Sequence, residues 1–86
     1  MSAFPDGYGV MVIGGGAGIG EATARYLAAA GVAVMVADRD AAGAERVADA
    51  IVAAGGRATG VRVDVTDPET LAEALTAMLG WNGRLH

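Results

Sequence analysis

Residues 10–20 read VMVIGGGAGIG, and this segment decides the fold. Its first four residues, Val10–Ile13, form a continuous apolar run, which is typical of a strand buried on both faces in a parallel sheet. Glycines end the run, and a helical pattern then continues as far as Gly31, a residue type that favours a helix end. The expected inward-facing stripe of this helix consists of Ile19, Thr23, Tyr26, Leu27 and Ala30.

The glycines between this strand and this helix have a conformational purpose. A chain that turns from a strand into a helix within a few residues needs positive φ angles and no Cβ in the way. Such a turn gathers peptide N–H groups outside the sheet, and the amino end of the helix adds its partial positive charge. The sequence therefore predicts that residues 14–20 bind a pyrophosphate group.

The spacing of the glycines distinguishes among nucleotide-binding turns. The frame G-x-G-x-x-G would need a glycine at Ile19 or at Glu21, so it fails in both alignments. The phosphate loop G-x-x-x-x-G-K would need a lysine where Glu21 stands. Only the frame Gly14-x-x-x-Gly18-x-Gly20 matches the sequence.

Beyond this turn, short β-branched runs alternate with alanine-rich segments of helical period, in the order β-α-β-α-β-α. Strands joined through a helix are parallel, and their crossovers are right-handed. We therefore expect an α/β, Rossmann-like, three-layer arrangement, which is the opening half of a doubly wound parallel sheet. The expected strands are Val10–Ile13, Val32–Ala37 and Val61–Val63, the last of them at a sheet edge.

The second and third helices have predicted ends and buried faces. Asp40 is expected to cap the second helix, which ends near Gly55. The third is expected to begin with a capping box formed by Thr66 and Glu69, and to end at Gly80. The expected buried residues are Ala44, Val47, Ala48, Ile51 and Val52 in the second helix, and Leu71, Leu75, Met78 and Leu79 in the third.

Composition excludes several classes of function. The 86 residues include six arginines, ten acidic side chains, no lysine and no cysteine, for a formal net charge of −4. Disulfides, cysteine zinc sites and Cys or Lys nucleophiles are therefore absent, and we expect no metal site. Dispersed arginines on an acidic chain do not form the basic stripe that nucleic acid requires. No apolar run approaches the ~20 residues that cross a bilayer, and residues 1–8 hold no base, so we expect no membrane partner and a cytoplasmic location.

Two further segments follow the glycine turn, VAVMVADR at residues 32–39 and DVTD at residues 64–67. In this order, the three segments resemble the short-chain dehydrogenase/reductase family over about residues 8–85. The resemblance is to the amino-terminal, NAD(P)-binding portion of these oxidoreductases. It implies that residues 1–86 form a partial dinucleotide-binding Rossmann domain, without the later strands and the catalytic part.

The resemblance assigns roles to three groups of residues. In this family an acid at the end of the second strand binds the hydroxyls of the adenosine ribose, which corresponds to Asp38. An Asp-Val pair after the third strand contacts adenine, which corresponds to Asp64 and Val65, and Arg39 is expected to lie over the adenine. The glycine turn holds the pyrophosphate, which corresponds to Gly14, Gly16, Ala17, Gly18, Ile19 and Gly20.

Asp38 predicts a cofactor preference. A carboxylate accepts hydrogen bonds from both ribose hydroxyls, but it repels the extra phosphate of NADP. Arg39 could reach that 2′-phosphate, although a surface arginine without a role in specificity is the plainer interpretation. We therefore expect NAD as the cofactor in preference to NADP.

Each of these assignments has a plainer alternative. The glycine segment could be a tight turn without a ligand, and Asp38 could be a solvated strand end. Asp64 could support the start of the following helix instead of contacting a base. The family usually has threonine before the first glycine, whereas this chain has Ile13.

The catalytic serine, tyrosine and lysine of the family cannot be located in this chain. It has no lysine, its one serine is Ser2, and the residues four positions after Tyr8 and Tyr26 are Val12 and Ala30. Hydride transfer needs a proton donor near the substrate carbonyl. We therefore expect no catalytic residue here and no reductase activity from this chain alone.

Three hypotheses about function follow. The chain is the NAD-binding portion of an oxidoreductase that transfers a hydride between the cofactor and an alcohol or carbonyl substrate, a stand-alone adenine-nucleotide-binding module, or an inactive truncated product. In the strand order of doubly wound sheets the first strand is central, so without the later strands its outer edge is open. We expect self-association through that edge.

Overall fold

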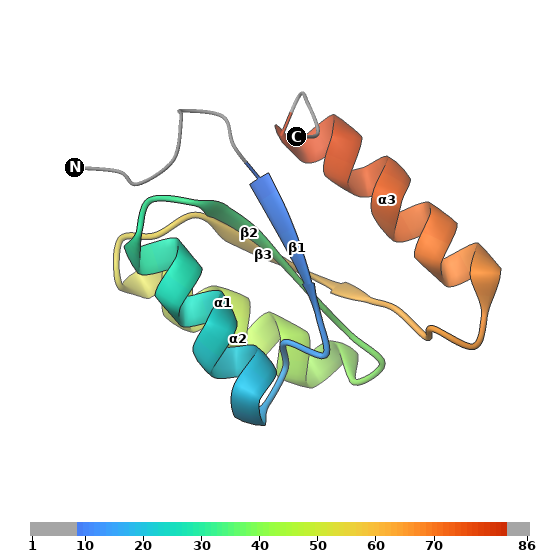
Figure 1. The fold of residues 1–86 in the computed structure, drawn as a ribbon, viewed down its shortest axis with the longest axis horizontal. Coiled ribbons are helices and arrows are strands. Elements are labelled where there is room, and N and C mark those ends of the chain that lie inside the picture. Colours follow the sequence, from blue (N-terminus) through green and yellow to red (C-terminus); the bar gives the residue numbers. More distant parts are fainter. Residues whose placement is uncertain (1–8, 83–86) are drawn as a thin grey trace.

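The computed structural model describes residues 9–82, and it describes side-chain surroundings for residues 9–77. Strands and helices alternate along the whole of this range (Figure 1), as the sequence predicted. The elements are β1 (Gly9–Ile13), α1 (Gly18–Ala29), β2 (Ala33–Asp38), α2 (Ala41–Ala53), β3 (Ala58–Arg62) and α3 (Pro68–Asn82).

The three strands form one parallel sheet in the order β1-β2-β3, with Gly9 opposite Ala33 and Val34 opposite Ala58. Helices α1 and α2 cover one face of the sheet and α3 lies on the other (Figure 1), which confirms the Rossmann-like, three-layer arrangement. Beyond the ladder, the Val63 N–H donates to the Asp38 carbonyl at 2.9 Å. The pairing therefore continues to the carboxyl ends of the strands, where the candidate site lies.

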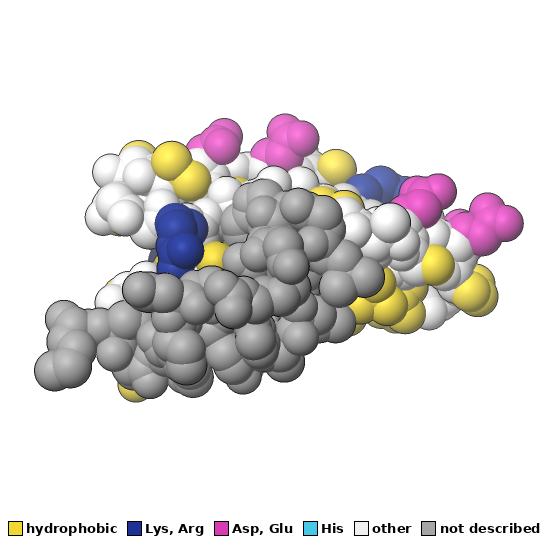
Figure 2. Space-filling model, turned by 90° about the horizontal axis from the view of Figure 1, so that it is seen from above, with side chains coloured by type: hydrophobic (Ala, Val, Ile, Leu, Met, Phe, Trp, Pro, Cys, Tyr) yellow, Lys and Arg dark blue, Asp and Glu magenta, His cyan; other side chains and the backbone are white. Residues whose placement is uncertain are grey.

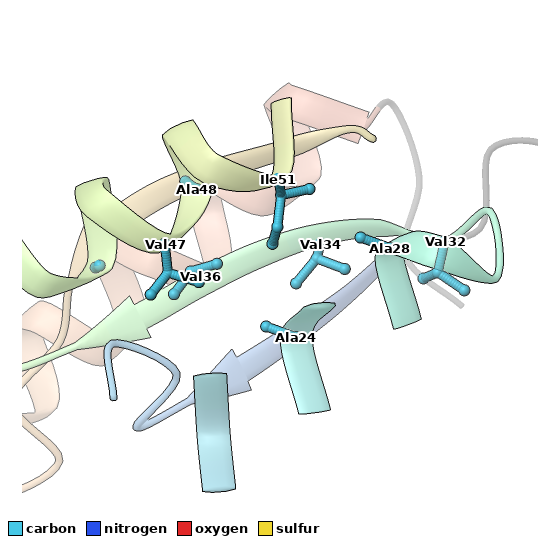
Figure 3. Packing of buried hydrophobic residues seen from close by; sticks show 9 residues of the cluster. Ala24, Ala28, Val32, Val34, Val36, Val47, Ala48 and Ile51 are labelled. Atoms are coloured by element: carbon cyan, nitrogen blue, oxygen red, sulfur yellow. The ribbon is translucent and has the colours of Figure 1, made fainter. Parts of the chain in front are cut away.

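The core is built mainly from valine and alanine. All of Ala33–Ala37 in β2 is buried, because this strand is central and both of its faces are covered. Val34 and Val36 point toward the helical layer of α1 and α2 (Figure 3). The helices meet them with Ala24, Ala28, Ala44, Val47, Ala48 and Ile51. Small alanine side chains let the two helices approach the sheet closely.

The predicted buried stripe of α1 is wrong at three of its positions, Ile19, Thr23 and Tyr26, all of which are exposed. Ile19 is 88% exposed and Tyr26 is 76% exposed, whereas Ala24 and Ala28 are buried. Successive helical residues are about 100° apart, so Ile19 and Tyr26 lie on the side of the helix away from these alanines. In α2 the predicted burial of Val52 is also wrong, since that side chain is 54% exposed. In α1 the residues that face the sheet are alanines, whose small side chains give a weaker periodic signal than isoleucine.

Helix α3 covers the second face of the sheet less extensively. Ala74 is buried, together with Ala37 and Val63 of the opposing surface. Leu75 was predicted to be buried but is 42% exposed. The helix also continues past Gly80 to Asn82, because a glycine weakens a helix without ending it. The predicted burial of Met78 and Leu79 lies outside the described side chains.

The surface agrees with the acidic composition. On the face in Figure 2, acidic side chains lie along the upper edge, and the arginines are dispersed, one of them beside an acidic group. Among residues 9–82, no helix is long and apolar enough to cross a membrane. Within the same range, no group of three or more His, Cys, Asp or Glu side chains is arranged to hold a metal ion.

Candidate functional site

The glycines of the matched frame are required for two different reasons. Gly14 has φ +81° and Gly18 has φ +60°, and these left-handed conformations are strained for residues with a Cβ. A Cβ on Gly20 would instead overlap the carbonyl group of Gly14. The first turn of α1 is therefore packed directly on the backbone that leaves β1. This close approach explains why the spacing is Gly14-x-x-x-Gly18-x-Gly20.

Gly16 joins the turn to the second strand and the second helix. Its N–H donates to Oδ2 of Asp38 at 3.0 Å, and its carbonyl accepts from Nη2 of Arg46 at 2.9 Å. A Cβ on Gly16 would lie 2.9 Å from Asp38 Oδ2 and 3.1 Å from the Ala44 nitrogen, so a side chain here would force the turn away from both. Arg46 was not among the predicted site residues, and its position in the middle of α2 gave no local signal.

The amino end of α1 has no side-chain cap. Ala17 stands at the N-cap position with an extended backbone, and alanine has no side-chain oxygen to accept a hydrogen bond. The Glu21 N–H donates to the Ala17 carbonyl at 3.3 Å. Within the described part of the chain, the N–H groups of residues 18–20 have no acceptor, and the positive end of the helix dipole lies beside them. An anion is the ligand that such a helix end attracts.

Both carboxylate oxygens of Asp38 accept backbone hydrogen bonds. Oδ1 accepts from the Asp40 N–H at 2.9 Å, and Oδ2 accepts from Gly16. These bonds, that from Asp40 first, lower the pKa of Asp38 from its ordinary value, so the group is ionised at neutral pH. A carboxylate has about four acceptor positions, so two remain for an incoming ligand. Asp40 takes the predicted N-cap position of α2, but its own carboxylate makes no capping hydrogen bond.

The second aspartate organises the turn before α3. Oδ1 of Asp64 accepts from the hydroxyl of Thr66 at 2.6 Å and from its N–H at 2.9 Å, and these bonds lower the pKa of Asp64. The predicted capping box of Thr66 and Glu69 is wrong. Instead, Oδ1 of Asp67 accepts from the Glu69 N–H at 3.0 Å, and the hydroxyl of Thr70 accepts from the Asp64 N–H at 3.0 Å. Asp64 therefore supports the start of α3, which was the alternative to a contact with the adenine base.

A hollow of about 230 Å³ lies at the carboxyl ends of the strands. It is smaller than the ~300–1,000 Å³ pockets that enclose drug-sized ligands. Five residues that the sequence singled out line it, namely Gly14, Asp38, Arg39, Asp64 and Val65. The sequence assigned no ligand-binding role to the other three lining residues, Ile13, Val63 and Thr66, although each is a neighbour in the chain of a predicted one. The structure thus brings the ends of all three strands together.

Another hollow, of about 240 Å³, lies between the carboxyl ends of α1 and α2. Apart from Arg25, its lining consists of alanine, glycine and isoleucine. It is at the opposite end of the helices from the glycine turn, and no residue predicted for a site lines it. The candidate site is therefore the hollow at the strand ends together with the adjoining turn.

Comparison with known proteins agrees with this geometry. A sequence model of the family described as short chain dehydrogenase matches residues 9–86. The chain belongs to this family. Short-chain dehydrogenases are oxidoreductases that bind NAD(P) cofactors.

Relatives of the chain include several named enzymes. Cyclohexanol dehydrogenase of Acinetobacter sp. (strain SE19) is 38% identical over 76 residues, which cover 88% of this chain and 30% of that protein. Cis-4-hydroxycyclohexanecarboxylate dehydrogenase of Sinomonas cyclohexanicum is 52% identical over 62 residues, which cover 72% of this chain and 24% of that protein. The chain spans about a third or less of the length of these relatives.

Solved structures of the family have the same fold. The crystal structure of a hydroxysteroid dehydrogenase from Escherichia coli aligns with a TM-score of 0.90 at 35% identity, covering 93% of this chain and 33% of that one. A 3-ketoacyl-ACP reductase from Sinorhizobium meliloti 1021 aligns with a TM-score of 0.86 at 40% identity, covering 91% of this chain and 30% of that one. The three parallel strands and their helices are therefore the arrangement found in this family.

Proposed function

We propose that this chain binds NAD at the glycine turn and the adjoining hollow. The pyrophosphate is held by the backbone N–H groups of residues 17–20, the ribose hydroxyls by Asp38, and the adenine between Arg39, Asp64 and Val65. The observation that carries this proposal is the hydrogen bond from Gly16 to Asp38, because it holds the anion-attracting turn and the sugar-binding acid side by side. Apolar carbons of Ile13, Val63 and Val65 in the hollow suit the flat face of a base.

NAD is favoured over NADP by the charge of Asp38. The lowered pKa keeps this carboxylate ionised, and a 2′-phosphate would bring like charge against it. Arg39 lines the same hollow, and its guanidinium is available to stack on the adenine. In this arrangement the arginine adds affinity for the base, and the aspartate sets the preference between the two cofactors.

The activity proposed for a full-length form is oxidation of an alcohol or reduction of a carbonyl compound. Bound NAD supplies hydride acceptance, and NADH supplies the hydride. The role proposed for this chain is to hold and orient the adenosine diphosphate half of the cofactor. We expect it to contribute no catalytic proton donor, since it has no lysine, its one serine is at position 2, and the residues four positions after Tyr8 and Tyr26 are Val12 and Ala30. The cytoplasmic location stays a prediction beside this role.

Calorimetric titration of the purified chain tests the proposal. We expect NAD to bind more tightly than NADP, and we expect Asp38→Ala and Gly18→Val to weaken binding at least about tenfold, because each removes a group or conformation on which the site depends. Unchanged NAD affinity in both variants would contradict the proposal. Binding of AMP with no gain from the rest of NAD would favour the adenine-nucleotide module instead.

The outer edge of β1 supports a second proposal, which concerns partners. In the described sheet β1 pairs only with β2, so its other side presents unpaired N–H and C=O groups. Ile13, at the end of this strand, is 50% exposed. We propose that two copies of the chain associate through β1, because strand pairing satisfies these backbone groups on both copies.

A further inference from the structure

Arg46 of α2 reaches across to the turn between β1 and α1. Its Nη2 donates to the Gly16 carbonyl at 2.9 Å and lies 3.1 Å from Oε1 of Glu21 in α1. One guanidinium nitrogen with two hydrogens therefore joins three segments, namely the glycine turn, α1 and α2. Residues 16 and 46 are 30 positions apart, so only the tertiary fold creates this contact.

Both backbone polar groups of Gly16 are therefore hydrogen-bonded. Asp38 accepts from its N–H, and Arg46 donates to its carbonyl. In a planar trans peptide the carbonyl and the following N–H point in opposite directions. Fixing the Gly16 carbonyl toward Arg46 therefore fixes the Ala17 N–H pointing away from Arg46. That N–H is the first of the amides at the start of α1.

We propose that Arg46 is a positioning residue for recognition of the cofactor pyrophosphate. It acts through the Gly16–Ala17 peptide and does not itself touch the ligand, and the inference rests on the proposed binding of a dinucleotide. Three successive glycines, residues 14–16, give this turn many alternative conformations, and no side chain of Ala17 caps the helix. A clamp from α2 removes those alternatives before the ligand arrives.

Glu21 completes the clamp. Its Oε1 is paired with Arg46, and its Oε2 is paired with Arg25 at 2.9 Å. The Glu21 side chain is 22% exposed, compared with 57% for Arg46, so the more buried partner anchors the more exposed one. Two guanidinium groups also offset the negative charge of Glu21, which otherwise stands in the first turn of α1, beside the anion site.

Hydrogen exchange of the ligand-free chain tests the clamp without any cofactor. Arg46→Met keeps most of the aliphatic length and removes the bonds to both Gly16 and Glu21. We expect the Gly16 amide to exchange about fivefold faster in this variant, because one net hydrogen bond of ordinary strength is lost. Arg46→Lys keeps a charged donor and should restore most of the protection.

Arg25→Met is the matched control, since it removes the other partner of Glu21 and leaves the Gly16 carbonyl bonded. Equal exchange in the parent and Arg46→Met, at any level of protection, overturns the proposal.

Ligand titrations separate positioning from a general structural effect. We expect Arg46→Met to bind NAD about fivefold more weakly while its affinity for adenosine, which has no phosphate, stays within about twofold of the parent. An equal loss for both ligands means that Arg46 only stabilises α2, and overturns the proposal. Weaker NAD binding with unchanged Gly16 exchange means direct contact with the ligand, and also overturns it. Failure of the parent to bind NAD rejects the proposed function itself, whereas the exchange result still decides whether the clamp exists.

Discussion

Gly18 and Gly55 have similar backbone conformations but different surroundings. Their φ angles are +60° and +93°, and a Cβ on either would meet no atom within 4 Å. The cost of alanine is therefore conformational at both positions, and only Gly18 lies in the cofactor turn. Substitutions at these two glycines therefore distinguish the effect of backbone strain on stability from its effect on cofactor binding.

We predict that Gly18→Ala and Gly55→Ala each lower the free energy of unfolding by about 1 kcal/mol, because an L side chain is strained in the left-handed region. Only Gly18→Ala should weaken NAD binding. Urea unfolding and calorimetric titration of the two variants measure these effects. If Gly55→Ala weakened NAD binding as much as Gly18→Ala, the location of the site would be wrong.

We predict that Asp38 contributes stability that is lost in acid. Hydrogen bonds from the backbone of Asp40 and Gly16 lower its pKa below the ordinary 3.8, so the folded chain binds this proton less readily than the unfolded chain. The stabilisation is present above about pH 3.8 and disappears as the pH falls through the lowered pKa. Urea midpoints measured from about pH 5 to about pH 3 should fall more for the parent than for Asp38→Asn. Parallel curves for the two proteins would refute the prediction.

At the scale of elements, α3 shows how a helix start is built from several segments. The Thr70 hydroxyl accepts from the Asp64 N–H and lies 2.9 Å from the Asp64 carbonyl, so it ties the first turn of α3 to the end of the β3 extension. The Thr76 hydroxyl, by contrast, bonds only locally, to the Ala72 carbonyl at 3.0 Å. Both are threonines of one helix, but only Thr70 joins two elements.

We predict that Thr70→Val lowers the free energy of unfolding by about 1 kcal/mol, because it leaves the Asp64 N–H without its partner. Thr76→Val should change it by less than about 0.5 kcal/mol, since an exposed local bond to the helix backbone adds little. Chemical denaturation of both variants tests the contrast. Equal effects would show that the bond to Asp64 does not contribute to stability.

The order and type of the elements could be predicted because each depends on local chemistry. The apolar run before Gly14 and the glycines that end it predict β1 and the turn wherever the chain is placed. The third strand is different. It begins at Ala58, earlier than the predicted Val61, because its amino half, which includes an alanine and a glycine, is defined by pairing with β2 and not by an apolar β-branched run. Element ends therefore depended on partners that the local sequence does not show.

At the scale of the whole molecule, the central strand β2 has all of its residues Ala33–Ala37 buried. Val34 is 0% exposed and packs against both helices of its face, whereas Val52 of α2 is 54% exposed. We predict that Val34→Ala lowers the free energy of unfolding by about 2 kcal/mol and Val52→Ala by less than about 0.5 kcal/mol. Thermal or urea unfolding distinguishes them. A comparable loss of stability in Val52→Ala would show that Val52 is buried, as helical periodicity alone predicted.

The open edge of β1 gives a prediction about assembly. We predict that the weight-average mass of the chain rises with concentration in sedimentation experiments, because the unpaired backbone groups of one β1 pair with those of another. Amides of residues 9–13 should exchange more slowly in the concentrated sample. A monomer at every concentration, or association without protection of these amides, would rule out this interface.

Local sequence by itself determined the alternation of strands and helices, the frame of the glycine turn and the identity of Asp38 as the acid after the second strand. These features depend on the local conformational preferences of the residues and on their spacing along the chain, and both can be read from the sequence. Only the tertiary structure decided which faces of α1 and α2 are buried, that Asp67 and Thr70 begin α3, and that Arg46 meets Gly16. The physical reason is that these contacts join residues of different elements, and their geometry exists only after the helices have packed on the sheet.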